Sequence, residues 1–282
     1  MRKPRRSGAT VRRIVVAADS SIDGRAALEA AVRLAARLEA EIEGLFVEDV
    51  NLKRLSELPV AREIRFGGTF QAHGTGGVLA DMRAEAEQTR QALEALATRA
   101  QIKVTFRVAE GRVETEVVAA ASGADLLILG LTGRRVLQTG RPGTTALAAV
   151  MRSTRSVLVL RPGVDITERA LALYDGSPGA DMALDLAARI AADDGGMLTV
   201  VLRAENEAEA QKLRRRAGET LTEYGVNGRY RVAPAPTLND LCRAVTMAGA
   251  SVLVISAADP LLAGEGSRRL LEDVACPVLL VR

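Results

Sequence analysis

The sequence predicts an α/β fold of two tandem, doubly wound domains, each with a five-stranded parallel sheet in the strand order 3-2-1-4-5. Three observations support it. An internal repeat spans nearly all of the 282 residues, apolar runs of strand length alternate with Ala/Leu-rich helical segments, and a polar turn follows the first strand of each repeat. Strands that are apolar on both faces and separated by helices are typical of a covered parallel sheet. Right-handed crossovers then give a Rossmann-like arrangement.

The repeat begins with equivalent segments over residues 12–47 and 169–202. Each has a short apolar run, a turn that starts with Asp19 or Asp175, an amphipathic helix and a second apolar run. The copies also end alike, with GADLLILG and STRSVLVLRPG in the first, and GASVLVISA and ACPVLLVR in the second. We therefore divide the chain into a basic disordered tail (1–11), a first domain (12–163) and a second domain (168–282).

In the first domain the apolar runs predict strands near residues 13–18, 41–47, 102–108, 124–129 and 155–161. The segments with apolar residues at helical spacing predict helices near 22–38, 80–100, 111–122 and 144–152. An extra segment follows the second strand. Its part NLKRLSELPVAREI (51–64) predicts a further helix, followed by a Gly-rich loop. This 50–79 insertion is either a lid or contact surface, or a surface insertion that costs little loop entropy.

Composition excludes several classes of protein. No apolar stretch approaches the roughly 18–20 residues of a membrane-spanning helix, so we expect no membrane partner and a cytoplasmic protein. The net charge is only +3, and the 2% aromatic content argues against nucleic acid as a partner of the basic tail. Cys242 and Cys276 are expected to be buried thiols. The single His73 makes no metal site, so no metal bound by side chains alone is expected.

The stretch GLTGRRVLQTGRPGTT (Gly130 to Thr145) follows the fourth strand. Ligands of an open parallel sheet bind beyond the carboxyl ends of its strands, where the strand order reverses. Glycine lets backbone approach a ligand closely, and the helix that starts near Thr144 offers N–H groups and a positive dipole end to an anion. The loop therefore predicts a phosphate site, although glycines that merely end a strand and cap a helix remain the structural alternative.

The spacing Gly130-x2-Gly133-x9-Gly143-Thr144, together with Asp19 after the first strand and IEGLFVEDV as the second, resembles the ATP-binding branch of the universal stress protein family. The resemblance covers the chain as a tandem pair. It implies that Asp19 contacts the nucleoside, that Ala17 and Val47 border the adenine, and that the four motif residues hold ribose and phosphates. We also expect the hydroxyl of Thr145 to donate a hydrogen bond to phosphate. Arg134 stands where the family often has an arginine. For Asp19 the alternative role is a helix N-cap.

The second half departs from this pattern. Ser256 and Asp259 stand where the first two glycines are expected, and the spacing to Gly266-Ser267 is shorter. A carboxylate there would repel phosphate. We therefore expect one nucleotide site per chain, in the first half, with ATP or AMP as ligand, with or without Mg²⁺.

Three functions follow from this sequence. The first is a nucleotide-binding stress-response or regulatory protein with an unknown protein partner. The second is an enzyme, at most a slow ATPase, because no catalytic residues converge on the predicted site. The third is a scaffold that binds no nucleotide. The apolar strands SVLVLRP and PVLLVR lie at sheet edges, and relatives often dimerise through this strand, so we expect an intrachain pseudo-dimer. Assembly of two chains into a homodimer is left open.

Overall fold

The computed structural model describes residues 11–19, 22–56, 63–64, 70–71, 75–132, 142–161, 163–167, 169–192 and 196–282. Residues 1–10 of the predicted basic tail (1–11), His73, Gly133 and Arg134 lie outside these ranges. Two halves, each with alternating strands and helices, form one ten-stranded sheet.

The first half consists of the following elements: β1 (Arg13–Ala17), α1 (Ile22–Leu38), β2 (Glu41–Asp49), α2 (Val50–Ser56), β3 (Glu63–Ile64), β4 (Phe70–Gln71), α3 (Thr75–Ala100), β5 (Val104–Gly111), α4 (Val113–Ala121), β6 (Leu126–Gly130), α5 (Thr144–Arg152) and β7 (Ser156–Leu160). The second half consists of β8 (Arg169–Tyr174), α6 (Pro178–Ala191), β9 (Met197–Leu202), α7 (Glu207–Tyr224), β10 (Asn227–Val232), α8 (Leu238–Ala248), β11 (Val252–Ser256), a 3-10 turn (Pro260–Leu262), α9 (Gly266–Asp273) and β12 (Val278–Val281).

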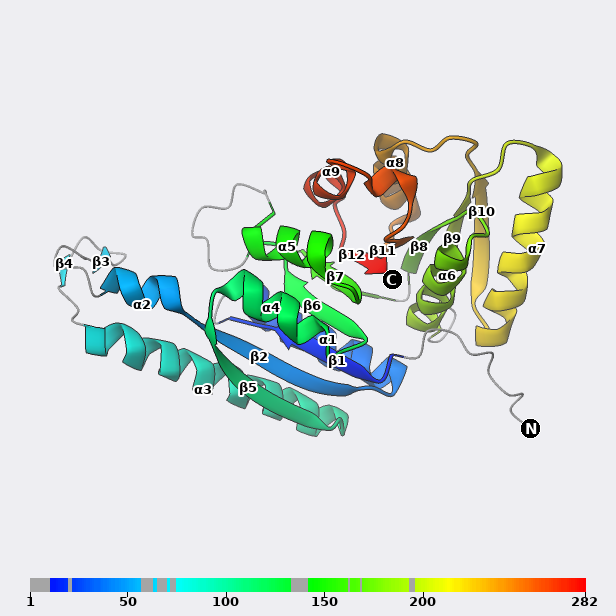
Figure 1. The fold of residues 1–282 in the computed structure, drawn as a ribbon. Helices are drawn as coiled ribbons and strands as arrows, with labels where there is room; N and C mark the ends of the chain where they lie inside the picture. The colour runs from blue at the N-terminus through cyan, green and yellow to red at the C-terminus, as the bar shows by residue number, and fades with distance from the viewer. Residues whose placement is uncertain are drawn as a thin grey trace.

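The strand order across the sheet is β10-β9-β8-β11-β12-β7-β6-β1-β2-β5. In each half the five strands of this sheet thus have the predicted order 3-2-1-4-5 and are all parallel. The halves meet where β12 pairs antiparallel with β7, with Leu279 opposite Leu158. The predicted fold class and the intrachain pseudo-dimer are confirmed, and the two five-stranded sheets are continuous (Figure 1).

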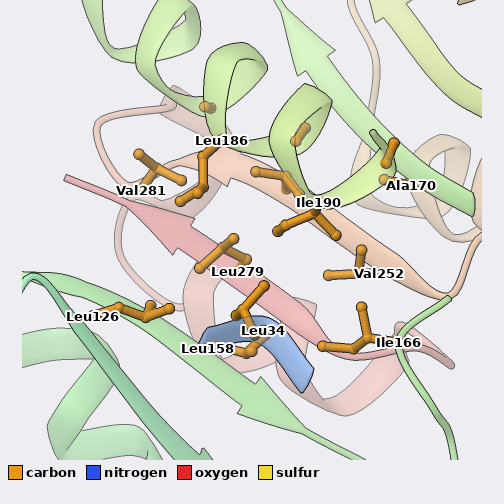
Figure 2. Close-up of a cluster of buried hydrophobic side chains, with 14 of the residues drawn as sticks. Leu34, Leu126, Leu158, Ile166, Ala170, Leu186, Ile190, Val252, Leu279 and Val281 are labelled. Atoms are coloured by element: carbon orange, nitrogen blue, oxygen red, sulfur yellow. The ribbon is translucent and has the colours of Figure 1, made fainter. Parts of the chain in front are cut away.

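Helices cover both faces of the sheet. On one face α1, α3, α6 and α7 bury one core, and on the other α4, α5, α8 and α9 bury a second core. Both cores run across the boundary between the halves. At that boundary Leu34, Leu158, Leu186, Ile190 and Leu279 gather from α1, β7, α6 and β12 into one cluster (Figure 2).

Arginine side chains of each half donate hydrogen bonds to backbone carbonyls of the other half, in reciprocal pairs. Arg37 of α1 donates to the carbonyl of Ile190 at 3.1 Å, and Arg189 of α6 donates to the carbonyl of Leu38 at 3.4 Å. On the other face Arg161, after β7, donates to the carbonyls of Leu271 and Glu272 in α9.

Arg282, the counterpart of Arg161 after β12, donates to the carbonyl of Val150 in α5 and to that of Arg155 at 3.1 Å. The last carbonyls of a helix have no partner inside the helix, so these guanidinium groups satisfy them from the opposite half.

Two expectations need correction. The helix predicted over residues 51–64 ends at Ser56 in α2, and Glu63–Ile64 instead pairs antiparallel with β4. The sequence has Pro59 in this stretch, and proline removes a helical N–H donor and restricts the residue before it. Cys276 is buried as expected, whereas Cys242 on α8 is partly exposed because it packs only at the border of its core.

Candidate nucleotide site

A cavity of about 530 Å³ lies at the carboxyl ends of β1, β2 and β6. Ala17 pairs with Leu45 in β2 and with Leu129 in β6, so β1 lies between them, where the strand order reverses. The cavity is therefore at the position that the doubly wound topology gives to a ligand. Its volume falls in the usual range for small-molecule sites.

Seven of the nine sequence-predicted site residues line this cavity: Ala17, Asp19, Val47, Gly130, Gly143, Thr144 and Thr145. The other two, Gly133 and Arg134, fall outside the described residues. One part of the wall is apolar and comes from the strand ends and from α4, including Leu45, Val47, Val113 and Val117. Such a wall can accept a flat, apolar ring.

Asp19 follows β1 and is fixed against the start of α1 by a close approach to Gly24. A Cβ atom added at Gly24 would lie 2.1 Å from the carbonyl oxygen of Asp19 and 2.6 Å from its Oδ1. Only glycine allows the first turn of α1 to pass this close to Asp19. Gly24 therefore positions a residue that the sequence motif identifies.

Another part of the cavity wall is the backbone that turns from β6 into α5. The N–H of Gly143 donates to the carbonyl of Leu131 at 2.7 Å, and a Cβ at Gly143 would lie 3.2 Å from the carbonyl oxygen of Thr132. Gly143 is the N-cap of α5, which begins at Thr144 as predicted. The first N–H groups of a helix have no partner within it and favour anions, so Thr144 and Thr145 lie at an anion-compatible position.

Three carboxylates also line the cavity: those of Asp19, Asp49 and Glu114. Asp49 accepts a hydrogen bond from the backbone N–H of Asn51 at 2.9 Å. Glu114, in the first turn of α4, accepts one from the hydroxyl of Thr144 at 2.7 Å. This bond and one from the backbone of Glu114 lower the pKa of its carboxyl group, so it is ionised at neutral pH.

Sequence reasoning missed five of the polar or glycine residues in this wall: Gly24, Asp49, Asn51, Glu114 and Thr132. Each follows a strand end or begins a helix at the same edge of the sheet. Because the carboxyl ends of parallel strands meet at one edge, Asp49 and Glu114 could have been found from their places after the second and third strands of this half.

The equivalent place in the second half is occupied by an ion-pair cluster. By strand register Arg203 stands where the first half has Val47, and Ser256 where it has Gly130. The guanidinium of Arg203 lies 2.9 Å from Asp259 Oδ1 and 3.6 Å from Asp175 Oδ2.

The side chain of Asp259 is only 6% exposed. Burial opposes ionisation of Asp175, but hydrogen bonds from Ser177 and the charge of Arg203 outweigh it and lower its pKa. In the second half, side chains of opposite charge thus link the strand ends whose counterparts in the first half surround the cavity.

Two further findings concern metal ions and membranes. Within the described ranges, no cluster of three or more His, Cys, Asp or Glu residues has a geometry that could hold a metal ion. No described helix combines the length and the apolar character needed to cross a bilayer.

Comparison with known proteins gives the chain a family. A model described as the universal stress protein family matches residues 10–161. A universal stress protein from Archaeoglobus fulgidus DSM 4304 is 17% identical, with 98% of this chain and 97% of that chain covered and a TM-score of 0.71. A putative universal stress protein from Pseudomonas aeruginosa UCBPP-PA14 is 17% identical, with coverages of 97% and 94% and a TM-score of 0.59.

A universal stress protein solved in complex with cAMP is 19% identical, with 55% of this chain and 99% of that chain covered and a TM-score of 0.38. The search of curated proteins gave no match. The family model spans the whole first half, including the cavity and its described motif residues, and the chain therefore belongs to the universal stress protein family.

Proposed function

We propose that the chain binds one adenine nucleotide, ATP or AMP, in its first half and acts as a stress-response regulator whose bound state alters its contact with a protein partner. The observation that carries the proposal is the cavity at the switch point, which is lined both by apolar side chains and by the N-terminus of α5. This combination suits a ligand with an apolar ring at one end and an anion at the other.

In this proposal the adenine lies against Ala17 and Val47, which border the apolar part of the cavity. The ribose lies near Asp19 and Gly130, at the ends of the two neighbouring central strands. A carboxylate accepts hydrogen bonds from hydroxyl groups, which fits Asp19 to the ribose rather than to phosphate.

The phosphates lie at Gly143, Thr144 and Thr145, with Gly133 and Arg134 as further contacts that the sequence motif supplies. A favourable contact at a helix end contributes only about 0.3–1 kcal/mol, and up to ~2 when partly buried, so several donors must act together. Because no described cluster of side chains suits a metal ion, a Mg²⁺ ion would be held largely by phosphate oxygens.

The ion pairs of the second half support the limit of one nucleotide per chain. Arg203 lies in the space that corresponds to the proposed adenine contact of Val47, and Asp259 replaces a motif glycine. A nucleotide there would have to separate Arg203 from a buried carboxylate, which is costly.

The expected cytoplasmic location also remains a proposal, supported by two free cysteines.

The proposal is tested by mass spectrometry of small molecules released from the purified chain. We expect an adenine nucleotide from the unmodified protein and from Gly123→Val, a matched change in the first half at a position where a Cβ meets nothing closer than 3.8 Å. We expect its loss from Gly133→Val. Thermal-shift titration with ATP, AMP and cAMP then ranks the ligands.

The outcomes separate the alternatives. No co-purified nucleotide and no thermal shift with any ligand would favour the scaffold function and contradict the proposal. Release of phosphate from ATP faster than about one per second, the low end for ordinary enzymes, would favour the enzyme instead.

A further inference from the structure

A carboxylate from α4 lies at the N-terminus of α5. Glu114 Oε1 accepts the hydrogen bond from Thr144 Oγ1 at 2.7 Å, across 30 residues of sequence. Both residues lie in the first turns of their helices, and these two helices pack directly against each other. The contact is therefore set by helix packing rather than by a loop.

The N-terminus of α5 lacks a negative charge of its own. Its N-cap is Gly143, which makes no side-chain capping bond, and its first turn has no acidic residue. By contrast α6, α7 and α8 each have an acidic residue in the first turn and a side-chain cap. Glu114 therefore supplies from a neighbouring helix the anion that a helix N-terminus favours.

The position that Glu114 approaches is the one proposed for phosphate, so two like charges compete for one helix end. We propose that Glu114 sets how much phosphate charge the cavity accepts, so that the site without a divalent cation favours adenosine and AMP over ATP. This inference rests on the proposed nucleotide site. It follows from the geometry that a carboxylate within hydrogen-bond distance of Thr144 repels each added phosphate.

Asp19 and Asp49 also lie in the cavity wall, at the ends of β1 and β2. Their charge affects every anionic ligand, but the carboxylate of Glu114 directly contacts the first turn of α5. A divalent cation bound to the phosphates offsets the repulsion, and the effect of Glu114 then becomes smaller.

The test is isothermal titration of the full chain with adenosine, AMP and ATP, each with and without Mg²⁺. Glu114→Gln keeps the size of the side chain and an acceptor oxygen for Thr144 but removes the charge. We expect its affinity for ATP without Mg²⁺ to rise about tenfold, which equals about 1.4 kcal/mol. The gain should be smaller for AMP, absent for adenosine, and reduced for ATP by Mg²⁺.

Glu116→Gln is the matched control, because Glu116 lies in the same helix but does not line the cavity. It should leave all affinities unchanged. Glu114→Ala, a second variant that removes both the charge and the hydrogen bond, should show the same dependence on phosphate number. Thermal melting verifies that each variant is folded.

An unchanged or weaker ATP affinity in folded Glu114→Gln would overturn the inference, as would an equal gain for adenosine. Failure of the proposed function looks different, because the unmodified chain would then bind none of the three ligands.

Discussion

Leu279 tests whether the two halves fold as one unit. It lies directly opposite Leu158 in the antiparallel strand pair that joins the halves, and both residues are 0% exposed. Leu279→Ala removes three carbon atoms, which costs about 2.4 kcal/mol at ~0.8 kcal/mol per buried methylene. The cavity left behind raises this to about 3–5 kcal/mol, because α1 and α6 hold the surroundings in place.

For a chain of this length, each kcal/mol shifts the melting temperature by about 2 °C, so we expect a decrease of roughly 6–10 °C. Differential scanning calorimetry should show one transition before and after the change. Met247→Ala, at a side chain in the same half that is 64% exposed, is the control and should leave the melting temperature nearly unchanged.

Hydrogen-exchange mass spectrometry then tests the mechanism. If the sheet is one cooperative unit, Leu279→Ala accelerates exchange in β1 and β6 of the first half as well as in β11. Two separate transitions, or faster exchange confined to the second half, would refute the reasoning.

Three further predictions follow from the contacts. Gly24→Ala should displace Asp19 and weaken adenosine and ATP binding alike, measured by titration, at a cost of about 1–3 kcal/mol in stability; unchanged binding would contradict the positioning role. Burial opposes ionisation of Glu43, but its bonds to Arg13 and Arg107 outweigh this and lower its pKa. Its contribution is therefore present at neutral pH and lost as the pH falls below about 4, so urea unfolding should separate Glu43→Gln from wild type only at the higher pH. Arg203→Val should cost roughly 3 kcal/mol by leaving Asp259 buried without its partner, yet calorimetry should still find one nucleotide per chain.

The strand order could be predicted from the sequence because the repeat, the apolar runs and the right-handed crossover rule leave few topologies. The place of Asp19, Gly130 and Thr144 around one cavity follows from the same topology, since the carboxyl ends of β1 and β6 are adjacent. Local sequence patterns were thus enough to predict the site residues that belong to a motif.

The remaining contacts depend on tertiary packing. The hydrogen bond between Glu114 and Thr144 exists because α4 packs on α5, and no local pattern reports that distance. The position of Arg203 between two carboxylates needs the strand register of the second half. The short strand Glu63–Ile64 was missed because a helical pattern on one side of Pro59 was extended across it.

The central claim is that backbone at the exit of β6 and the start of α5 binds the anionic end of one adenine nucleotide. A crystal structure of the full chain grown with excess ATP and Mg²⁺ measures this directly. We predict adenine beside Val47, phosphates at Gly143 to Thr145, and the pair between Arg203 and Asp259 intact. A first-half cavity filled by protein side chains despite excess ATP, or phosphates bound only in the second half, would contradict the account.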